Sequence, residues 1–432
     1  MTLDLMKTIA EHESEVRSYV RNFPAVFEKA RGSWLYDTDG RAYLDFFAGA
    51  SVLNYGHNHP ELKQALLDYI AGDNISHSLD MASVARAEFL DAFERIILEP
   101  RGLDYKVQFP GPAGNNAVEA ALKIARKVKG REKLMSFTNA FHGMTLGALS
   151  ITGNAFKRQG AGLPLTHSDS MPYSNYFGPE QNTIEYIDRM LEDSGSGMDL
   201  PAAAVVETVQ AEGGVKVAAD EWLRGLQEVC EKYDIMLVVD DIQTGNGRCG
   251  TFFSFEEAGI KPDVVTVSKS ISGYGLPMAL TLLKPEYDIW EPGEHNGTFR
   301  GNNLAFVTAR RTLELFWSDD SLEQDITRRA TLIERTLHEL GRKYPEAEAT
   351  PRGRGMMQAI EFGNTELAGK VSEVAFRNGL IIETAGPDDE VLKLLPPLTT
   401  SDADIRHGLE IIDQSIATAL QELGVTRKVA SE

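Results

Sequence analysis

Two charged side chains stand where strongly apolar segments end. Lys269 follows the run VVTVS (264–268) and precedes the glycine-containing loop SISGYG, and Asp240 ends the run IMLVVD. At the end of a strand, such residues are ordinarily surface groups or caps of the next turn. If they are buried instead, the carboxylate needs a cationic or proton-donating partner, and the amine becomes a candidate nucleophile.

Other predicted strand ends also carry chemically useful groups. Gly114 and Asn115 open a helical run, where unpaired backbone N–H groups and the helix dipole suit a phosphate. Phe141, in the turn AFHG, can lie flat against an aromatic ring, and Gln243 follows shortly after Asp240. Taken singly, Gly114 and Asn115 could be an ordinary helix start, and Phe141 is more often a core phenylalanine. Ligands of open parallel sheets bind beyond the carboxyl ends of the strands, so we expect these groups to share one site.

A phosphate cradle, a stacking ring, a carboxylate and a lysine amine together are typical of a pyridoxal 5′-phosphate site. Lys269 would form an internal Schiff base with the cofactor and later move a proton as general base. Asp240 would keep the ring nitrogen of the cofactor protonated. The predicted cofactor-binding residues of this site are Gly114, Asn115, Phe141, His142, Glu207, Asp240, Gln243 and Lys269.

The elements that must position these residues alternate along the chain from about residue 105. Apolar β-branched runs at 105–109, 133–139, 202–208, 235–242 and 262–268 alternate with helical patterns, which predicts an α/β fold with a mostly parallel sheet. Earlier segments predict a helix at 4–20, a hairpin at 33–49 and a helix at 59–72. We place a large domain at 77–317 and a smaller one built from 1–76 and 318–432.

Composition excludes several classes of protein. The 432 residues carry a net charge of −21, which disfavours binding to nucleic acid or to anionic membranes. Cys230 and Cys249 form no CxxC pair or Cys/His cluster, so we expect no disulfide framework and no metal site. No apolar run is long enough to span a membrane, and the amino terminus does not resemble a signal peptide. These features predict a cytoplasmic protein with small-molecule substrates.

Several stretches resemble the class III pyridoxal-phosphate aminotransferases of fold type I over nearly the whole chain. They include SWLYDTDGRAYLDF, AFHGMTLGALS, LVVDDIQTGNGRCGTFFSFE, VSKSISGYGLPMA and GTFRGNNLA. The resemblance implies a large domain with a mostly parallel seven-stranded sheet and a smaller α+β domain from both chain ends. It also implies a homodimer, or a higher homo-oligomer, with active sites shared between subunits.

The same resemblance implies further residue roles. Thr298 would reach the phosphate bound by the neighbouring subunit, and Gln243 would lie near the phenolic oxygen of the cofactor. Arg352, in PRGRG, would hold the α-carboxylate of glutamate through two parallel hydrogen bonds. Glu212 would act as a gate, pairing with Arg352 when an ω-amine is bound and releasing it when glutamate arrives.

Within the family, SVLNYGHNHP and SKSISGYGLPMAL resemble enzymes that transfer the amino group of L-glutamate to L-aspartate 4-semialdehyde. The products would be L-2,4-diaminobutyrate, a precursor of the osmoprotectant ectoine, and 2-oxoglutarate. Met144 stands where many relatives acting on 4-aminobutyrate or ornithine have arginine. Ornithine-specific relatives also tend to have a tyrosine near the position of Ala50, which this chain lacks. Both differences disfavour those two substrates. The groups that bind the γ-carboxylate of glutamate and the α-carboxylate of the semialdehyde stay open.

Three alternatives remain at this stage. The first is another ω-aminotransferase of the class, acting on 4-aminobutyrate, ornithine or a polyamine. The second is an aminomutase of the same fold, which Arg352 and Glu212 disfavour because they imply two substrates. The third is a cofactor-sensing domain, which the net charge of −21 and the lack of a DNA-binding module disfavour.

Overall fold

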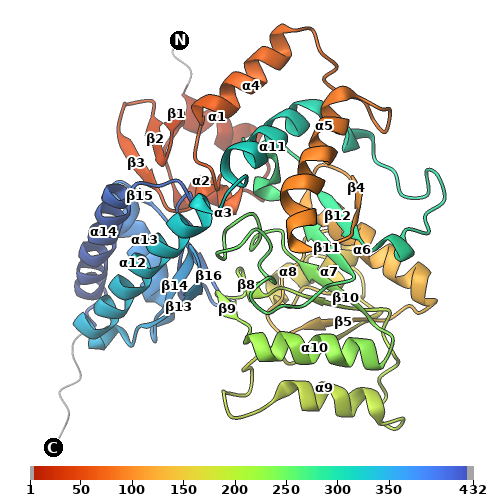
Figure 1. Cartoon of the computed structure of the whole chain (residues 1–432). Coiled ribbons are helices and arrows are strands. Elements are labelled where there is room, and N and C mark those ends of the chain that lie inside the picture. The colour runs from red at the N-terminus through yellow and green to blue at the C-terminus, as the bar shows by residue number, and fades with distance from the viewer. Residues whose placement is uncertain (1–3, 426–432) are drawn as a thin grey trace, which may run out of the picture.

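A seven-stranded sheet forms the centre of the protein in the computed structural model, which describes residues 4–425 (Figure 1). The strand order is β4-β12-β11-β10-β7-β5-β6. Only β12 runs antiparallel to its neighbours, so the expected mostly parallel seven-stranded sheet is confirmed. The strands are β4 (Lys106–Gln108), β5 (Leu134–Phe137), β6 (Ser168–Met171), β7 (Ala203–Val206), β10 (Met236–Asp240), β11 (Val264–Val267) and β12 (Leu280–Leu283).

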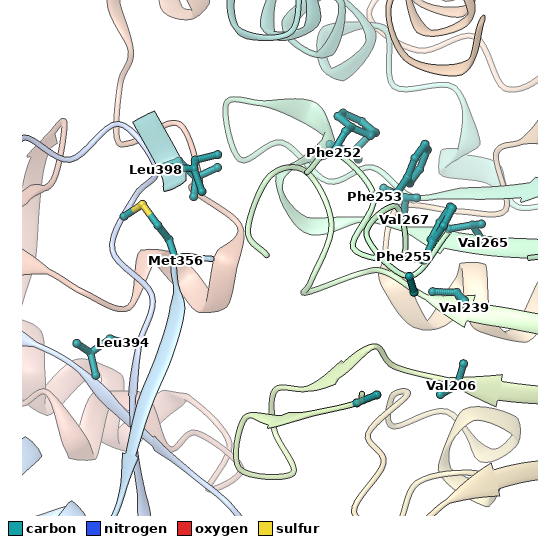
Figure 2. Close-up of a cluster of buried hydrophobic side chains, with 14 of the residues drawn as sticks. Val206, Val239, Phe252, Phe253, Phe255, Val265, Val267, Met356, Leu394 and Leu398 are labelled. Carbon is teal, nitrogen blue, oxygen red and sulfur yellow. The ribbon is translucent and has the colours of Figure 1, made fainter. Parts of the chain in front are cut away.

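Both faces of this sheet are buried, which explains the continuous apolar runs in its central strands. Val239 and Val265 are paired in register and belong to a core cluster that contains Phe252 and Phe253 (Figure 2). Their neighbours Val238 and Val264 belong to a separate cluster, which includes apolar residues of α6 (Gly114–Lys129). The central strands are therefore packed on both faces, and Asp240 and Lys269 lie at or just beyond their carboxyl ends.

Two smaller four-stranded sheets join segments far apart in the sequence. The first has the order β1-β2-β3-β15 and combines β1 (Phe27–Arg31), β2 (Trp34–Asp37), β3 (Ala42–Asp45) and β15 (Leu380–Ile381). The second has the order β13-β14-β17-β16 and combines β13 (Thr350–Arg354), β14 (Met357–Glu361), β16 (Glu383–Ala385) and β17 (Val391–Leu394). In Figure 1 the red amino-terminal strands accordingly lie beside blue carboxy-terminal elements. The domain boundaries at residues 76 and 317 stay predictions.

The helices cover these sheets and connect their strands. The α-helices are α1 (Leu5–His12), α2 (Tyr19–Asn22), α3 (Ala48–Ser51), α4 (Pro60–Ala71), α5 (Val84–Phe93), α6, α7 (Leu146–Ser150), α8 (Ala155–Gln159), α9 (Thr183–Glu192), α10 (Asp220–Lys232), α11 (Asn303–Phe316), α12 (Ser321–Lys343), α13 (Thr365–Arg377) and α14 (Asp402–Glu422). Short helical turns are η1 (Glu94–Leu98), η2 (Glu99–Arg101), η3 (Lys269–Ser272), η4 (Pro285–Tyr287), η5 (Thr298–Arg300) and η6 (Pro345–Ala347), and β8 (Val209–Gln210) pairs with β9 (Lys216–Val217).

The local expectations hold for the hairpin at 33–49 and for the helix at 59–72, which are β2–β3 and α4. The single helix expected at 4–20 is wrong, because α1 ends at His12 and the chain is extended at Glu13. The guanidinium of Arg17 there donates to the carbonyls of Glu13 and Ser14, which stabilises the break. Within residues 4–425, no helix combines the length and the apolar character required to cross a membrane.

Candidate active site

A cavity of about 420 Å³ lies at the carboxyl ends of the central strands. It brings together nine of the residues singled out in the sequence, although these come from separate strand ends and loops. They are Gly114, Asn115, Phe141, His142, Glu207, Glu212, Asp240, Gln243 and Lys269. The strands are parallel here, so the loops that follow them meet at one edge of the sheet.

Lys269 follows β11 in an unusual backbone conformation. Its φ angle of 52° lies in the left-handed region, which costs a non-glycine residue of order 1–3 kcal/mol and is concentrated at functional sites. The Nζ atom donates to the carbonyl oxygen of Ala50 at 2.9 Å. Burial lowers the pKa of Lys269 to about 8, although the charge of Glu212 opposes that shift. The amine is therefore poised between its charged and neutral forms near physiological pH.

The carboxylate of Asp240 is buried and held by three donors. Its Oδ2 lies 2.7 Å from Nδ1 of His142, while Oδ1 accepts from the hydroxyl of Thr266 at 3.0 Å and from the N–H of Ile242 at 3.2 Å. Burial by itself would lower the pKa of His142, but the hydrogen bond and charge of Asp240 outweigh it and raise that pKa. The pair fixes both side chains at the end of β10.

Glu207 and Phe141 are joined through the backbone. Oε2 of Glu207 accepts from the N–H of Phe141 at 3.0 Å, which ties the turn after β5 to the end of β7. Burial raises the pKa of Glu207 to about 8, while the charge of His142 opposes the shift. The Glu207 carboxyl is thus mostly protonated at neutral pH, and its main contact positions the Phe141 turn.

Close packing of glycines brings backbone groups to the cavity. A Cβ atom on Gly114 would lie 3.0 Å from Cδ1 of Ile242, and one on Gly143 would lie 2.8 Å from Cβ of Asn115. Helix α6 begins at Gly114, and the alanine that precedes it offers no side-chain cap for the first amides. These N–H groups stay available to an anion.

Glu212 connects the cavity to a buried cation. Its Oε1 accepts from Nε2 of Gln243 at 3.2 Å and from Nζ of Lys393 at 2.8 Å. Lys393 has no exposed surface and also pairs with Glu383 at 3.0 Å. Burial would raise the pKa of Glu212, but Lys393 and Lys269 lower it to about 2. The Glu212 side chain is therefore an anion at every pH of interest, and it separates Lys393 from the cavity.

The expected pairing of Glu212 with Arg352 is not present. Arg352 lies on β13, where its guanidinium pairs with Glu361 of the adjacent strand and Nε donates to the carbonyl oxygen of Gly214 at 2.7 Å. It lines a different cavity, beside Tyr173. The reason is strand register, because β13 directs Arg352 toward its β14 neighbour while β17 carries Lys393 to Glu212.

Lys393 was missed by the sequence analysis, although a signal for it exists. It is the single charged residue in the run VLKLLPPL (391–398), and a lysine inside so apolar a strand requires carboxylate partners.

Thr298 lies in η5 with its carbonyl oxygen 2.7 Å from Nε2 of His77. It does not line the cavity of its own chain, and its role toward a neighbouring subunit stays a prediction.

Comparison with known proteins agrees with this geometry. The family model for aminotransferase class III matches residues 16–416. The chain belongs to the class III aminotransferases. Members of this family depend on pyridoxal 5′-phosphate.

Relatives and solved structures in this group match nearly the whole chain. A diaminobutyrate–2-oxoglutarate transaminase of Sporosarcina pasteurii is 55% identical over 96% of this chain and 98% of its own. One of Streptomyces avermitilis is 57% identical over 94% and 96%. An ornithine aminotransferase of Toxoplasma gondii superposes with a TM-score of 0.83 at 25% identity, covering 98% of this chain and 96% of its own. A transaminase of a marine Virgibacillus bacterium superposes with a TM-score of 0.87 at 21% identity, covering 98% and 100%, which shows the shared fold.

The residues of this class III aminotransferase fit its cofactor. Nε2 of His142 and Oε1 of Gln243 are buried, and neither has a hydrogen-bond partner among the described residues. The cavity also offers the uncapped amides at Gly114, the ring of Phe141 and the amine of Lys269. A phosphorylated pyridine aldehyde requires an anion cradle, an apolar face, polar partners for its ring substituents and an amine.

Proposed function

We propose that this enzyme transfers the amino group of L-glutamate to the aldehyde of L-aspartate 4-semialdehyde. The products are L-2,4-diaminobutyrate and 2-oxoglutarate, and the reaction serves ectoine synthesis. The observation that carries the proposal is the identity of 54–58% to diaminobutyrate–2-oxoglutarate transaminases over 93–100% of their length. At 25% identity, the ornithine aminotransferase is a far more distant relative.

Several residues of this chain would hold the cofactor. The amides at Gly114 and Asn115 would bind its phosphate, Phe141 would pack against its ring, and Asp240 would pair with its ring nitrogen. Pyridoxal 5′-phosphate, when bound, supplies an aldehyde that reacts with amines and a ring that accepts the electrons released at the substrate carbon.

Lys269 would supply the amine that attaches the cofactor and would then move a proton at the substrate carbon. Its pKa of about 8 leaves enough neutral amine at physiological pH for this role. The carbonyl oxygen of Ala50 accepts a hydrogen bond from that nitrogen and orients it.

Two substrates of different charge must use one site. We assign the gate to Glu212 and Lys393, because their ion pair replaces the expected pair with Arg352. Glutamate has a carboxylate on its reacting carbon, and this group would displace Glu212 and meet the Lys393 ammonium. The semialdehyde has no carboxylate there, so Glu212 would stay paired. Glu383 keeps Lys393 partnered in both states, which limits the cost of separating the first pair.

A substrate panel tests the proposal. The cofactor-loaded protein is mixed separately with L-glutamate, L-2,4-diaminobutyrate, 4-aminobutyrate and ornithine, and the loss of long-wavelength absorbance is followed. We expect glutamate and diaminobutyrate to react, with release of 2-oxoglutarate from glutamate. Efficient reaction of 4-aminobutyrate with none of diaminobutyrate would refute the substrate assignment.

We further propose that the enzyme is a cytoplasmic homodimer in which Thr298 completes the site of the partner. Cys230 and Cys249 are buried and unpaired, which suits a reducing compartment. Mass measurement in solution tests the assembly, and a monomer with full activity would contradict it.

A further inference from the structure

A second cavity of about 660 Å³ adjoins the first and shares Phe141 and Glu212 with it. Part of its wall comes from the segment 153–157, which includes the start of α8, and part from the segment 384–389, at the end of β16 and in the loop that follows. The N–H of Gly386 donates to the carbonyl oxygen of Glu212 at 3.1 Å, so the loop is attached to the gate residue. A substrate that reacts at Lys269 can therefore extend past Phe141 into this space.

Lys157 is the cation of this second cavity. Its Nζ lies over the ring of Phe141, 4.2 Å from the centroid, and the side chain is half-buried. No carboxylate in residues 4–425 forms an ion pair with it, and its charge contributes to the low pKa of Glu212. Lys393 and Arg352, by contrast, are already paired with glutamates. Met144 is apolar and 56% exposed, so it cannot hold a carboxylate.

We propose that this second cavity binds the end of each substrate remote from the reaction, with the Lys157 ammonium holding its carboxylate. The inference rests on the proposed substrates. In glutamate the γ-carboxylate lies three carbon–carbon bonds from the reacting carbon. In the semialdehyde and in diaminobutyrate, the α-carboxylate also lies three bonds from the reacting carbon. One cation at one position therefore serves both half-reactions, whereas the carboxylate of ornithine lies one bond farther away.

The segment 384–389 provides the complementary charge. Asp388 and Asp389 are exposed at this cavity, and the loop that carries them is tied to the backbone of Glu212. Diaminobutyrate has an ammonium beside its remote carboxylate, but glutamate and 4-aminobutyrate have none. The two aspartates thus favour the four-carbon diamino acid over 4-aminobutyrate, which has the same chain length and the same carboxylate.

The test compares each substrate with its analogue lacking the remote carboxylate. The pairs are diaminobutyrate with 1,3-diaminopropane and glutamate with 2-aminobutyrate, and kcat/KM is measured for the half-reactions of cofactor-loaded enzyme. We expect Lys157→Met to lower kcat/KM for both complete substrates by about 10- to 100-fold, as for loss of a charged hydrogen bond. For the two truncated amines, kcat/KM should change by less than about twofold, because they have no remote carboxylate to contact Lys157. Lys157→Arg should retain most of the wild-type values.

Lys123→Met is the matched control. Lys123 also lies over an aromatic ring, 5.6 Å from the centroid of Trp290, but outside both cavities. The Lys123→Met substitution should leave kcat/KM unchanged for all four substrates. If Lys157→Met lowers kcat/KM equally for complete and truncated substrates, or changes kcat/KM for none of them, the proposal is wrong.

The double variant D388N/D389N tests the role of the two aspartates. It should reduce the ratio of kcat/KM for diaminobutyrate to kcat/KM for 4-aminobutyrate while leaving kcat/KM for glutamate unchanged. An unchanged preference would refute the role of the aspartates.

A binding measurement separates this inference from the proposed function. Glutarate, an unreactive dicarboxylate, is titrated into cofactor-loaded wild-type and Lys157→Met protein by calorimetry. We expect the variant to bind it about 10-fold more weakly or worse. If wild-type enzyme uses neither glutamate nor diaminobutyrate but shows this difference, the carboxylate site stands and the substrate assignment fails. Equal affinities in the two proteins would overturn the site.

Discussion

Glu212→Gln is the substitution that tests the gate most directly. Glutamine has nearly the same shape as glutamate but cannot neutralise the Lys393 ammonium, which lies 2.8 Å from the Glu212 carboxylate. Glutamate would then reach Lys393 without first separating an ion pair. Diaminobutyrate would instead approach a cavity wall with an excess positive charge. We therefore expect the ratio of kcat/KM for glutamate to kcat/KM for diaminobutyrate to rise.

The size of this change follows from the electrostatics of Glu212. A pKa lowered from 4.5 to about 2 corresponds to about 3 kcal/mol in favour of the charged form. Lys393 keeps its contact with Glu383 at 3.0 Å in the variant, so part of that energy is retained. If about half of it appears in the kinetics, the ratio rises roughly 10-fold.

The assay is the absorbance change of each half-reaction, measured for wild type, Glu212→Gln and the control Glu361→Gln. Glu361 is also a carboxylate paired with a cation, but its partner is Arg352 and it lines neither cavity of the site. The control should keep the wild-type ratio. A ratio that is unchanged or lower in Glu212→Gln would refute the gate. A shift of equal size in Glu361→Gln would indicate that Arg352, the partner of Glu361, binds the α-carboxylate of glutamate instead of Lys393.

Three further predictions concern the centre of the site. Lys269→Ala should abolish covalent attachment of the cofactor, seen in the absorbance of denatured protein, and retained transamination would contradict the role of this amine. For cofactor-free protein, the pKa of Lys269 is about 8 when folded and 10.5 when unfolded. The unfolded chain therefore binds more protons between these values, and stability rises with pH across that window. Lys269→Met should accordingly exceed wild type in unfolding free energy by up to about 3 kcal/mol at pH 7, with the difference shrinking toward pH 10 in denaturant titrations. Asp240→Asn should lower the pKa of His142, measured by NMR, and reduce kcat by about 100-fold or more; an unaltered His142 titration would show that the carboxylate does not control that ring.

Strand-end reasoning succeeded where the sheet is parallel. Lys269 follows β11 and Asp240 ends β10, which are neighbours in register, and Phe141 follows β5 on the same sheet. Apolar runs identify such strands, and the geometry of a parallel sheet then places their ends together. The sequence was less informative about β12, the single antiparallel strand, because LTLL has no helix on either side of it to mark a crossover.

The carboxylate-binding cations could not be assigned in this way. Arg352 was expected to bind the α-carboxylate of glutamate, but its register on β13 turns it toward Glu361. Lys393 and Glu212 are separated by a long stretch of chain and meet only because β17 lies beside the connection between β8 and β9. Lys157 belongs to a short helix whose sequence resembles an ordinary surface turn.

The sequence by itself therefore determined the family, the α/β architecture and the residues at the ends of the central strands, because apolar periodicity and local motifs encode all three. The tertiary structure alone decided which cation faces Glu212 and which one lies over Phe141. These pairings depend on the register and packing of segments remote in the chain, and no local pattern carries that information.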